Sequence, residues 1–564
     1  MSKHKNNFSK EQYLIFARES HQKNDFQKTI DYLQKVIEID PNHADSYSNL
    51  GVAFVAIAEY QKAIDCYEKA IEINPNHRQA YHNLGVSLEA TSEYQKAINC
   101  FKKTIEIDSN NKDAFNCLGS IFAKLQENNK AIAYYKKAIE IDPNCIIAHN
   151  NLGELFGENG EYQKSIACYE NVIKIDPEYA IAYNNLGVQF TRIKDYKKAI
   201  VCYEKAIEIN PTSFDTKKNI AAFHITLSND FDKAIDASHQ TLKLNQDQTK
   251  FINQGISLFR LKHDVEQAKY LGQTGGFWKF FKSKSDKIDG IDQFQKIGDE
   301  ILSRKENKET ENNSDKKILL TTDEINALLP FYKSDHLYKP KIISENCINP
   351  NKNWLEVEEE YFNSPKQIIY IDDFLSEETV SELREFCLIS KVWNTEYNNK
   401  YLGAFSDSGF ISQIHLQIAK DLQQKLPKLF GPHDLGRFWG FKYDTTLGKG
   451  INVHADFAIH NLNFWITPDE FNNNKNSGGL KVYDVPTPDH WTFKDYNANS
   501  KNIYTFLDTH NANCTNVPYK FNRAVLFNSA YFHETDEIDF KDEYEGRRIN
   551  MTYLFGRRLV KSKN

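Results

Sequence analysis

Residues 178–211 read EYAIAYNNLGVQFTRIKDYKKAIVCYEKAIEINP, and the same pattern recurs upstream with a period of 34 residues. Each unit ends on a proline, with Ser109 in the one vacant place: Pro41, Pro75, Pro143, Pro177 and Pro211. A Leu-Gly pair recurs at 50–51, 84–85, 118–119, 152–153 and 186–187. Glycine lets two helices approach closely, and proline cannot continue a helix. The period therefore predicts a stack of helical hairpins, each ended by its proline.

Other positions of the unit are equally regular. An aromatic residue or His lies three residues before each Leu, at Tyr47, Tyr81, Phe115, His149 and Tyr183. A small residue opens each second helix, and an aromatic residue follows four residues later. The pattern resembles the tetratricopeptide repeat. The resemblance implies an N-terminal all-α tetratricopeptide superhelix of about seven units over residues 8–246, with a less regular first unit and a degenerate last one.

Asparagine recurs directly before the Leu place of the repeat. The positions are Asn49, Asn83, Asn151, Asn185 and Asn219, and Cys117 is the exception. In a tetratricopeptide superhelix this position faces the concave groove. The array is similar to the repeat domain of O-GlcNAc transferases, where a row of Asn side chains holds an extended peptide. The resemblance implies a protein or peptide partner in this groove. The alternative is that Asn is a tolerated polar residue at this position.

Three features define the middle of the chain. Residues 247–302 continue with a weaker helical pattern, and we expect a helical cap there. The aromatic cluster Gly275–Phe281 is interpreted as a buried patch of that cap, with a membrane-touching or ligand-binding wedge as the alternative. Residues 303–317 contain no apolar residue and are expected to form a flexible linker. A further domain is therefore expected over residues 318–564.

Composition excludes several functional classes. The net charge of −7 gives no electrostatic basis for binding nucleic acid. No run of about 18 apolar residues is present, so no membrane span is expected. The polar N-terminus lacks the apolar segment of a secretory signal. The nine cysteines are dispersed without a CxxC pair, which favours a reducing, cytoplasmic setting.

The pattern of residue types changes after residue 318, where β-branched and aromatic residues dominate short segments bounded by turn residues. We expect strands at 367–371, 439–443, 462–466, 480–483, 523–527 and 549–555, and helices at 376–390 and 412–427. Strands dominate after residue 437. This order predicts a double-stranded β-helix (jelly roll) with flanking helices.

A candidate metal site lies within these strands. In an extended segment His454 and Asp456 point to the same side, and His533 follows the strand at 523–527. Two imidazoles and one carboxylate suit a non-haem Fe(II) centre with open positions. The tripeptide HxD alone is weak, since the chain has 17 histidines. A second copy at His43–Asp45 lies in the repeats without a downstream partner, and we dismiss it.

Residues 366–558 resemble the prolyl-hydroxylase-like branch of the 2-oxoglutarate and Fe(II)-dependent oxygenases. The similarity includes the entry segment Ile369–Ser376, the Ser477–Leu480 turn and the strand before His533. The last strand is preceded by Arg547 and Arg548, and Arg548-Ile549-Asn550 is similar to the family's Arg-x-Ser motif. The interval from His533 to Arg548 is longer than usual, which implies an extended loop at 534–546. The arginine that binds the co-substrate is therefore either residue, and the spacing to Asn550 favours Arg548.

The resemblance implies a role for each site residue. His454, Asp456 and His533 would hold Fe(II), while 2-oxoglutarate and O2 would take the remaining positions. Arg548 would pair with the distal carboxylate of 2-oxoglutarate, with Tyr443 as a second contact and Asn463 facing the site. Tyr443 could alternatively be a core tyrosine. We expect His460 to have a structural or surface role, with a position in the site as the alternative, and both His490 and His510 to be exposed.

The leading functional hypothesis combines the two halves of the chain. The repeats would recruit a protein or peptide, and the C-terminal domain would hydroxylate it as an Fe(II)- and 2-oxoglutarate-dependent dioxygenase. One alternative is a non-catalytic interaction scaffold whose jelly roll has lost its metal. A second alternative is a small-molecule oxygenase whose repeats serve assembly. The substrate, the hydroxylated atom and the oligomeric state do not follow from the sequence.

Overall fold

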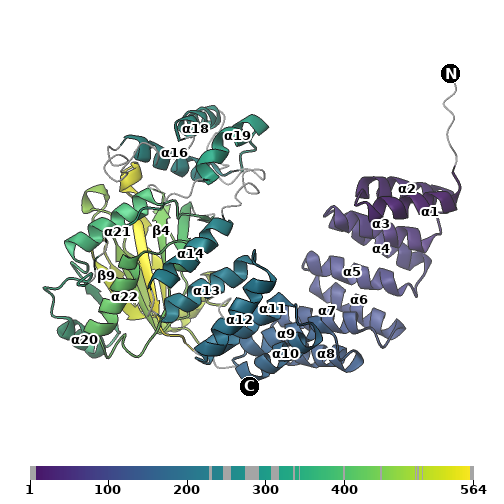
Figure 1. Ribbon diagram of the computed structural model, residues 1–564, viewed down its shortest axis with the longest axis horizontal. Helices are drawn as coiled ribbons and strands as arrows, with labels where there is room; N and C mark the ends of the chain where they lie inside the picture. The colour runs from purple at the N-terminus through teal and green to yellow at the C-terminus, as the bar shows by residue number, and fades with distance from the viewer. Residues whose placement is uncertain are drawn as a thin grey trace. The chain divides into compact units, whose positions relative to one another are not determined.

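The computed structural model describes residues 8–227, 231–245, 256–273, 291–306, 317–333, 337–341, 343, 345–397, 400–444, 448–488, 491, 495–497 and 500–558. The chain divides into two compact units, Met1–Ile209 and Asn210–Asn564 (Figure 1). The first unit is helical. The second combines helices with antiparallel strands.

The first unit consists of consecutive helical hairpins. Its helices are α1 (Lys10–Gln22), α2 (Phe26–Ile39), α3 (Ala44–Ala56), α4 (Tyr60–Ile73), α5 (Arg78–Ala90), α6 (Tyr94–Ile107), α7 (Lys112–Lys124), α8 (Asn128–Ile141), α9 (Ile146–Glu158), α10 (Tyr162–Ile175), α11 (Ala180–Arg192) and α12 (Tyr196–Ile209). In the repeats that carry the proline, it follows directly after the residue that caps the second helix, as at Asn74 and Pro75. Helix α7 contacts both α5 and α9, which are the first helices of the neighbouring hairpins.

The recurrent glycine is explained by the aromatic residue of its own hairpin. A Cβ added at Gly51 would lie 2.6 Å from the ring of Tyr67, and one at Gly119 would lie 2.5 Å from Tyr135. Both aromatic rings are buried. The helices therefore approach closely only where the first helix carries no side chain. This accounts for the constant spacing between the glycine and the aromatic residue in successive repeats.

The second unit contains helices before, within and after the middle segment of the chain. They are α13 (Phe214–Leu227), α14 (Phe231–Asn245), α16 (Leu258–Gln273), α18 (Ile291–Glu306), α19 (Thr322–Lys333), α20 (Trp354–Asn363), α21 (Glu377–Ile389), α22 (Gln413–Lys425) and α23 (Ser500–Thr509). Short 3-10 turns lie at η2 (Ser406–Ser408), η3 (Asp469–Phe471) and η4 (Tyr544–Gly546). Ser376 caps α21 by accepting a hydrogen bond from the backbone of Thr379, as its position before two glutamates predicts.

The strands of the second unit are β1 (Ile368–Ile371), β2 (Thr395–Tyr397), β3 (Tyr401–Phe405), β4 (Leu435–Tyr443), β5 (Gly448–Lys449), β6 (His460–Trp465), β7 (Leu480–Pro486), β8 (Cys514–Val517), β9 (Ala524–Asn528), β10 (Tyr531–Thr535), β11 (Glu537–Ile538) and β12 (Ile549–Phe555). A seven-stranded sheet has the order β1-β9-β6-β12-β4-β3-β2, and a smaller one has the order β10-β7-β8. Strands β5 and β11 form a two-stranded pair. All described pairings are antiparallel.

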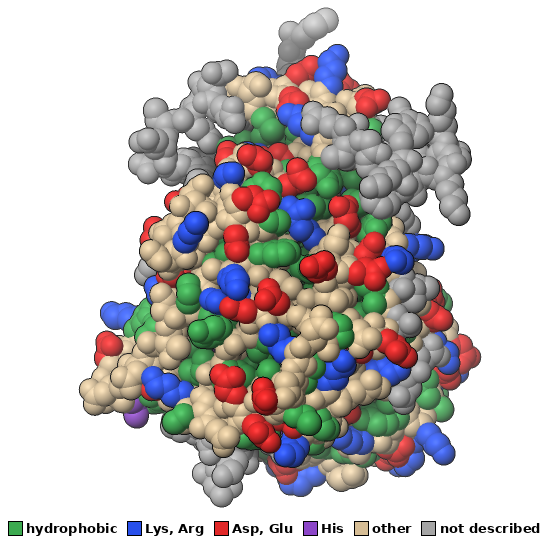
Figure 2. Space-filling model, turned by 90° about the vertical axis from the view of Figure 1, so that its left-hand side faces the viewer, with side chains coloured by type: hydrophobic (Ala, Val, Ile, Leu, Met, Phe, Trp, Pro, Cys, Tyr) green, Lys and Arg blue, Asp and Glu red, His purple; other side chains and the backbone are tan. Residues whose placement is uncertain are grey.

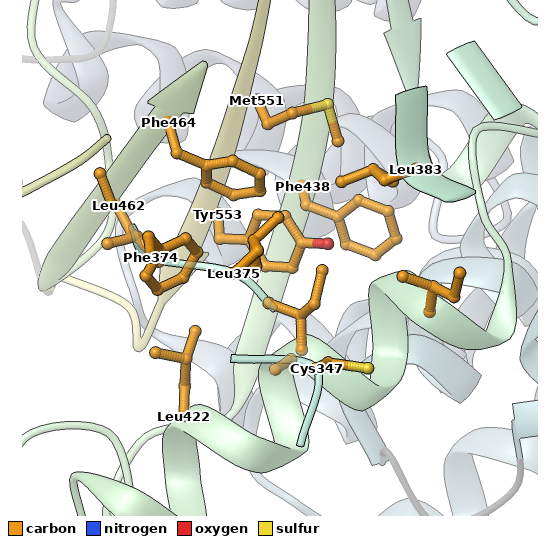
Figure 3. Close-up of a cluster of buried hydrophobic side chains, with 14 of the residues drawn as sticks. Cys347, Phe374, Leu375, Leu383, Leu422, Phe438, Leu462, Phe464, Met551 and Tyr553 are labelled. Carbon is orange, nitrogen blue, oxygen red and sulfur yellow. The ribbon is translucent and has the colours of Figure 1, made fainter. Parts of the chain in front are cut away.

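One face of the large sheet is covered by helices. Phe438, Phe464, Met551 and Tyr553 point from the strands toward Leu383 of α21 and the neighbouring helix α22 (Figure 3). These residues alternate along their strands with residues of the opposite face, as a pleated strand requires. Burial on this face fixes the strand register, because a slip of one residue would exchange the two faces.

The opposite face of the large sheet packs against the smaller sheet. Trp465, Phe441 and Leu554 of the large sheet share a buried cluster with Leu480 and Val482 of β7. The backbones of His454 and His533 pair as an isolated antiparallel bridge, which extends the smaller sheet beside β10. This space between the two sheets holds the candidate site.

Helices α13 and α14 belong to the second unit, although their sequence continues the repeat pattern. Ile225 and Ala234 are buried in the core beneath the large sheet. Ser238 donates a hydrogen bond to the carbonyl of Ser406 and accepts one from the amide of Gly409, at 2.6 and 2.8 Å. The sequence places the end of the array at residue 246, whereas the boundary between the two units lies at residue 210. The two differ because side chains of α13 and α14 are buried by residues far downstream.

The middle segment also packs within the second unit. Helices α16, α18 and α19 share a buried cluster that includes Ile318. Gln267 of α16 donates hydrogen bonds to the carbonyls of Leu388 and Ser390, both at 3.2 Å. Helix α18 extends to Glu306, so the first residues of the expected linker are helical. Residues 275–281 and 307–316 lie outside the described part of the chain.

The surface shown in Figure 2 carries acidic and basic side chains in close alternation, without a large patch of either charge. This agrees with the modest net charge of −7. Within the described residues, no helix is both long and apolar enough to cross a membrane.

Candidate functional site

His454, Asp456 and His533 come together between the two sheets. One candidate ligand atom from each residue lies within 4.8 Å of the other two. Nε2 of His533 is 3.4 Å from Oδ2 of Asp456, and the rings of the two histidines are 4.3 Å apart. Asp456 and His533 are buried, and His454 is partly exposed. The structure thus brings together the three residues that the sequence predicted as metal ligands.

The hydrogen bonds of both histidines favour one ring nitrogen as a ligand. Nδ1 of His454 lies 2.8 Å from the carbonyl of Asn452, and Nδ1 of His533 lies 3.2 Å from the carbonyl of Tyr531. A carbonyl only accepts, so Nδ1 carries the proton in each ring. The lone pair is then on Nε2, which is the tautomer that second-sphere carbonyls commonly select in metal sites.

Protonation also suits cation binding at this site. Burial lowers the pKa of His454 to about 4, and His533 acts in the same direction. Burial raises the pKa of Asp456, but the neighbouring imidazoles of His533 and His454, in their doubly protonated form, outweigh burial and lower the pKa overall. At neutral pH the site therefore offers a neutral imidazole at His454 and an ionised carboxylate at Asp456.

A hollow beside the three residues continues along the inner face of the large sheet. Its polar lining includes Asn463 of β6 and both Asn550 and Thr552 of β12. Its apolar lining comes from Trp439, Phe441, Ile451 and Leu480. Tyr443, at the end of β4, and Arg548, directly before β12, lie one inward-facing position beyond this lining.

Arg548 is a buried cation without a carboxylate partner. Its exposed fraction is 1%, and no carboxylate among the described residues lies within ion-pair distance. Its Nε donates to the carbonyl of Gly478 at 2.6 Å, and its guanidinium lies 4.8 Å from the ring of Tyr443. Burial lowers its pKa. A buried unpaired charge is costly, so the arrangement favours an anion that binds beside it.

Two buried polar atoms, one of this guanidinium and one beside it, also favour an acidic ligand. Nη1 of Arg548 and the hydroxyl of Tyr443 meet no hydrogen-bond partner in the described part of the protein. Most buried polar groups in proteins are satisfied, so each unpaired group requires an explanation. An acidic ligand that accepts from both atoms would supply it. The donor set therefore fits a carboxylate group of a bound ligand.

Arg547 has a different environment from Arg548. Its guanidinium donates to Glu266 of α16 at 2.6 Å and lies 3.4 Å from Asp444. Both arginines directly precede β12, and the carbonyl of Arg548 continues the pairing with β4 by accepting from the amide of Tyr443. Adjacent residues of an extended segment face opposite sides, so only one of the two arginines faces the space between the sheets. The structure places Arg548 there and Arg547 in an ion pair elsewhere. The extended segment after His533 contains β11 and η4.

Sequence reasoning missed Asn461, which contacts the candidate ligand Asp456 directly. The amide of Asn461 donates to Oδ2 of Asp456, and Asn463 donates to Asn461 at 2.5 Å. The carbonyl of Asn463 accepts from Asn550 and from Thr552, at 3.1 and 2.6 Å. A detectable signal was present, since polar residues alternate with Leu462 and Phe464 on this buried strand.

The other histidines considered lie apart from this site. The ring of His460 packs edge-on against Phe430 and at a tilt against His433, and its Nδ1 is 3.3 Å from the hydroxyl of Tyr361. His43 caps α3 by accepting from the amide of Ser46. His510 is exposed, as expected, and His490 is outside the described residues.

The repeat asparagines form lateral contacts within the first unit. Asn151 donates to Asn116 at 3.2 Å, and Asn185 donates to Asn150 at 3.4 Å. Asn83 accepts from Gln79, whereas Asn49 is exposed. Asn219 is part of α13 in the second unit. The partners Asn116 and Asn150, which sequence reasoning missed, stand one place earlier in the preceding repeat.

Comparison with known families identifies the repeats. The model described as "Tetratricopeptide repeat" matches residues 44–77, 79–111 and 180–213. A second model of that description matches residues 13–43, and a "TPR repeat" model matches 119–160 and 153–193. The N-terminal region is a tetratricopeptide repeat array. Such arrays present extended concave surfaces, so this region is a protein-interaction scaffold.

Solved structures of repeat proteins are similar to part of the chain. YrrB, described as "a TPR protein with an unusual peptide-binding site", is 27% identical; the match covers 33% of this chain and 95% of YrrB, with a TM-score of 0.28. MamA is 26% identical over 29% of this chain and 96% of MamA, with a TM-score of 0.28. Pseudomonas aeruginosa PilF is 19% identical over 37% of this chain and 96% of PilF, with a TM-score of 0.33. No curated protein sequence matches the chain.

Proposed function

We propose that the second unit is an Fe(II)- and 2-oxoglutarate-dependent dioxygenase that hydroxylates a protein or peptide recruited by the repeats. The observation that carries the proposal is the pairing of two features between the same two sheets. One is the cluster of His454, Asp456 and His533. The other is the buried, unpaired guanidinium of Arg548.

Each residue of the site would have a separate role. His454, Asp456 and His533 would hold Fe(II), which would supply the centre at which O2 and 2-oxoglutarate react to oxidise a C–H bond. The guanidinium of Arg548 would donate hydrogen bonds to the distal carboxylate, and the hydroxyl of Tyr443 would donate a further one. The apolar wall formed by Trp439, Phe441 and Leu480 would exclude water from this region.

We further infer that the two facing sheets are those of a double-stranded β-helix, or jelly roll. The bridge between His454 and His533 supports this inference, because it joins the metal-binding segment to the smaller sheet. The nine cysteines are free, and we place the protein in a reducing, cytoplasmic environment on that basis.

Recruitment is assigned to the repeats. Asn151 and Asn185 have amides aligned by Asn116 and Asn150, so they present ordered carbonyl and amide groups to an extended backbone. Binding in the array would raise the local concentration of the substrate at the catalytic unit. Replacing Asn83, Asn151 and Asn185 by Ala is expected to weaken the binding of a substrate peptide, and unchanged affinity would refute this role.

Succinate release from 2-oxoglutarate in the presence of Fe(II) tests the catalytic proposal. His454→Ala is expected to reduce this release to background. His43→Ala is the matched control, because it alters the other HxD tripeptide, and its loss of the cap to Ser46 should cost about 1 kcal/mol of stability without affecting turnover. Full turnover in His454→Ala would refute the site.

A further inference from the structure

The chain of amides beside Asp456 has a fixed direction. A carboxylate only accepts hydrogen bonds, so Asn461 must present its NH2 group to Oδ2. Its carbonyl therefore faces Asn463, which must present NH2 in turn. The carbonyl of Asn463 then faces the donors Asn550 and Thr552. Every donor in the chain points toward the carboxylate.

Asn461 is fully buried, and both ends of its amide are engaged in this chain. Rotation of this amide would break its hydrogen bond to Asp456 or to Asn463 in a buried environment, where the loss of a hydrogen bond is most costly. The amide thus fixes the rotation of the Asp456 carboxylate. The same amide is anchored, through Asn463, to β12, the strand that Arg548 directly precedes.

We propose that Asn461 is a positioning residue that orients Asp456 for metal binding and links it to the co-substrate pocket through Asn463. The inference rests on the iron site proposed above. Asn461 itself touches neither substrate nor metal; it acts through the carboxylate that it holds. Outer-sphere partners of this kind change metal affinity by about 10- to 100-fold when they are removed.

The experiment compares two asparagine variants in the full chain. Asn461→Leu keeps a similar volume and removes the donor to Asp456. Asn522→Ala is the matched control, because Asn522 is also buried and makes two hydrogen bonds, both to the backbone of Leu375, away from the three candidate ligands. Thermal unfolding of both variants measures the structural cost, and titration with Co2+ under anaerobic conditions measures metal affinity.

Asn461→Leu is expected to bind Co2+ about 10- to 100-fold more weakly and to change its visible absorption, which reports ligand geometry. Asn522→Ala is expected to lose thermal stability and to keep wild-type affinity and absorption. Wild-type binding in Asn461→Leu would overturn the positioning role while leaving the metal site standing. Equal Co2+ binding by the wild type and His454→Ala would overturn the site itself, and the inference with it.

Discussion

The two adjacent arginines have opposite roles at the scale of single residues. We expect Arg548→Gln to weaken 2-oxoglutarate binding about 100-fold, because two charge-assisted hydrogen bonds are lost. We expect Arg547→Gln to leave this binding unchanged and to lower the free energy of unfolding by about 3 kcal/mol, since Glu266 loses the partner that lies 2.6 Å away. Calorimetric titration and urea denaturation check the two expectations, and the reverse assignment would give the opposite pair of results.

His415 provides a pH-dependent prediction remote from the metal ligands. Its ring packs on Phe386, Phe410 and Phe438, and burial lowers its pKa to about 3. The unfolded state, with a pKa of about 6.5, therefore binds a proton that the folded state does not. The free energy of unfolding should fall as pH decreases below about 6.5, with a loss from this residue of about 2 kcal/mol by pH 5.

Denaturation followed by tryptophan fluorescence measures this effect selectively, because all six tryptophans belong to the second unit. His415→Phe should show a shallower decline between pH 7 and pH 5, by about one proton. Identical slopes in the two proteins would show that His415 does not titrate on unfolding.

Single residues also show how far the sequence could predict the site. Spacing was sufficient for His454 and Asp456, because residues two apart in an extended segment share a side. Spacing to Asn550 favoured Arg548 over Arg547 but left both possible, because a slip of one residue in the register exchanges their faces. The alternation of Asn461 and Asn463 with Leu462 and Phe464 indicated a polar face on this strand. The contact of Asn461 with Asp456 was missed because it depends on how the segment from Asp456 to His460 folds back, which no local pattern specifies.

The hairpin α13–α14 carries the main prediction at the scale of structural elements. It is buried against the large sheet and η2, so we expect residues 210–564 to fold alone and residues 247–564 to expose apolar surface and aggregate. Circular dichroism and size-exclusion chromatography of the two fragments check this. A monomeric, cooperatively folding 247–564 fragment would contradict it.

Ser238→Ala isolates one contact of that hairpin. The substitution leaves the amide of Gly409 and the carbonyl of Ser406 without a buried partner. A loss of about 1–3 kcal/mol in the free energy of unfolding is expected, again followed by tryptophan fluorescence. Ser303→Ala, on the exposed surface of α18, is the control and should cost little.

The sequence predicted most elements of both units but not the association of this hairpin. Strands at 439–443 and 549–555 and the helix opened by Ser376 were placed within a few residues. The repeat pattern continues through Ala221 and Asn219, so the hairpin looked like the last unit of the array. Its partners Ser406 and Gly409 lie well over 100 residues downstream, and such non-local burial leaves no periodic signal.

At the scale of the whole molecule, we expect the two units to separate recruitment from chemistry. The fragment 210–564 should keep the basal conversion of 2-oxoglutarate to succinate within about twofold of the full chain. Its kcat/KM for a protein substrate of the full chain should fall by about 100-fold or more, because the local concentration provided by the repeats is lost. Equal kcat/KM values would favour an oxygenase that does not use the repeats for its substrate.

The central claim is that His454, Asp456, His533 and Arg548 together form one site for a metal and an acidic co-substrate. Anaerobic calorimetric titration of 2-oxoglutarate into the Fe(II)-loaded full chain tests it most directly. Binding is expected in the wild type, and it should be lost in His454→Ala, where the metal is lost, and weakened about 100-fold in Arg548→Gln. No binding by the wild type, or equal binding by all three proteins, would contradict the claim.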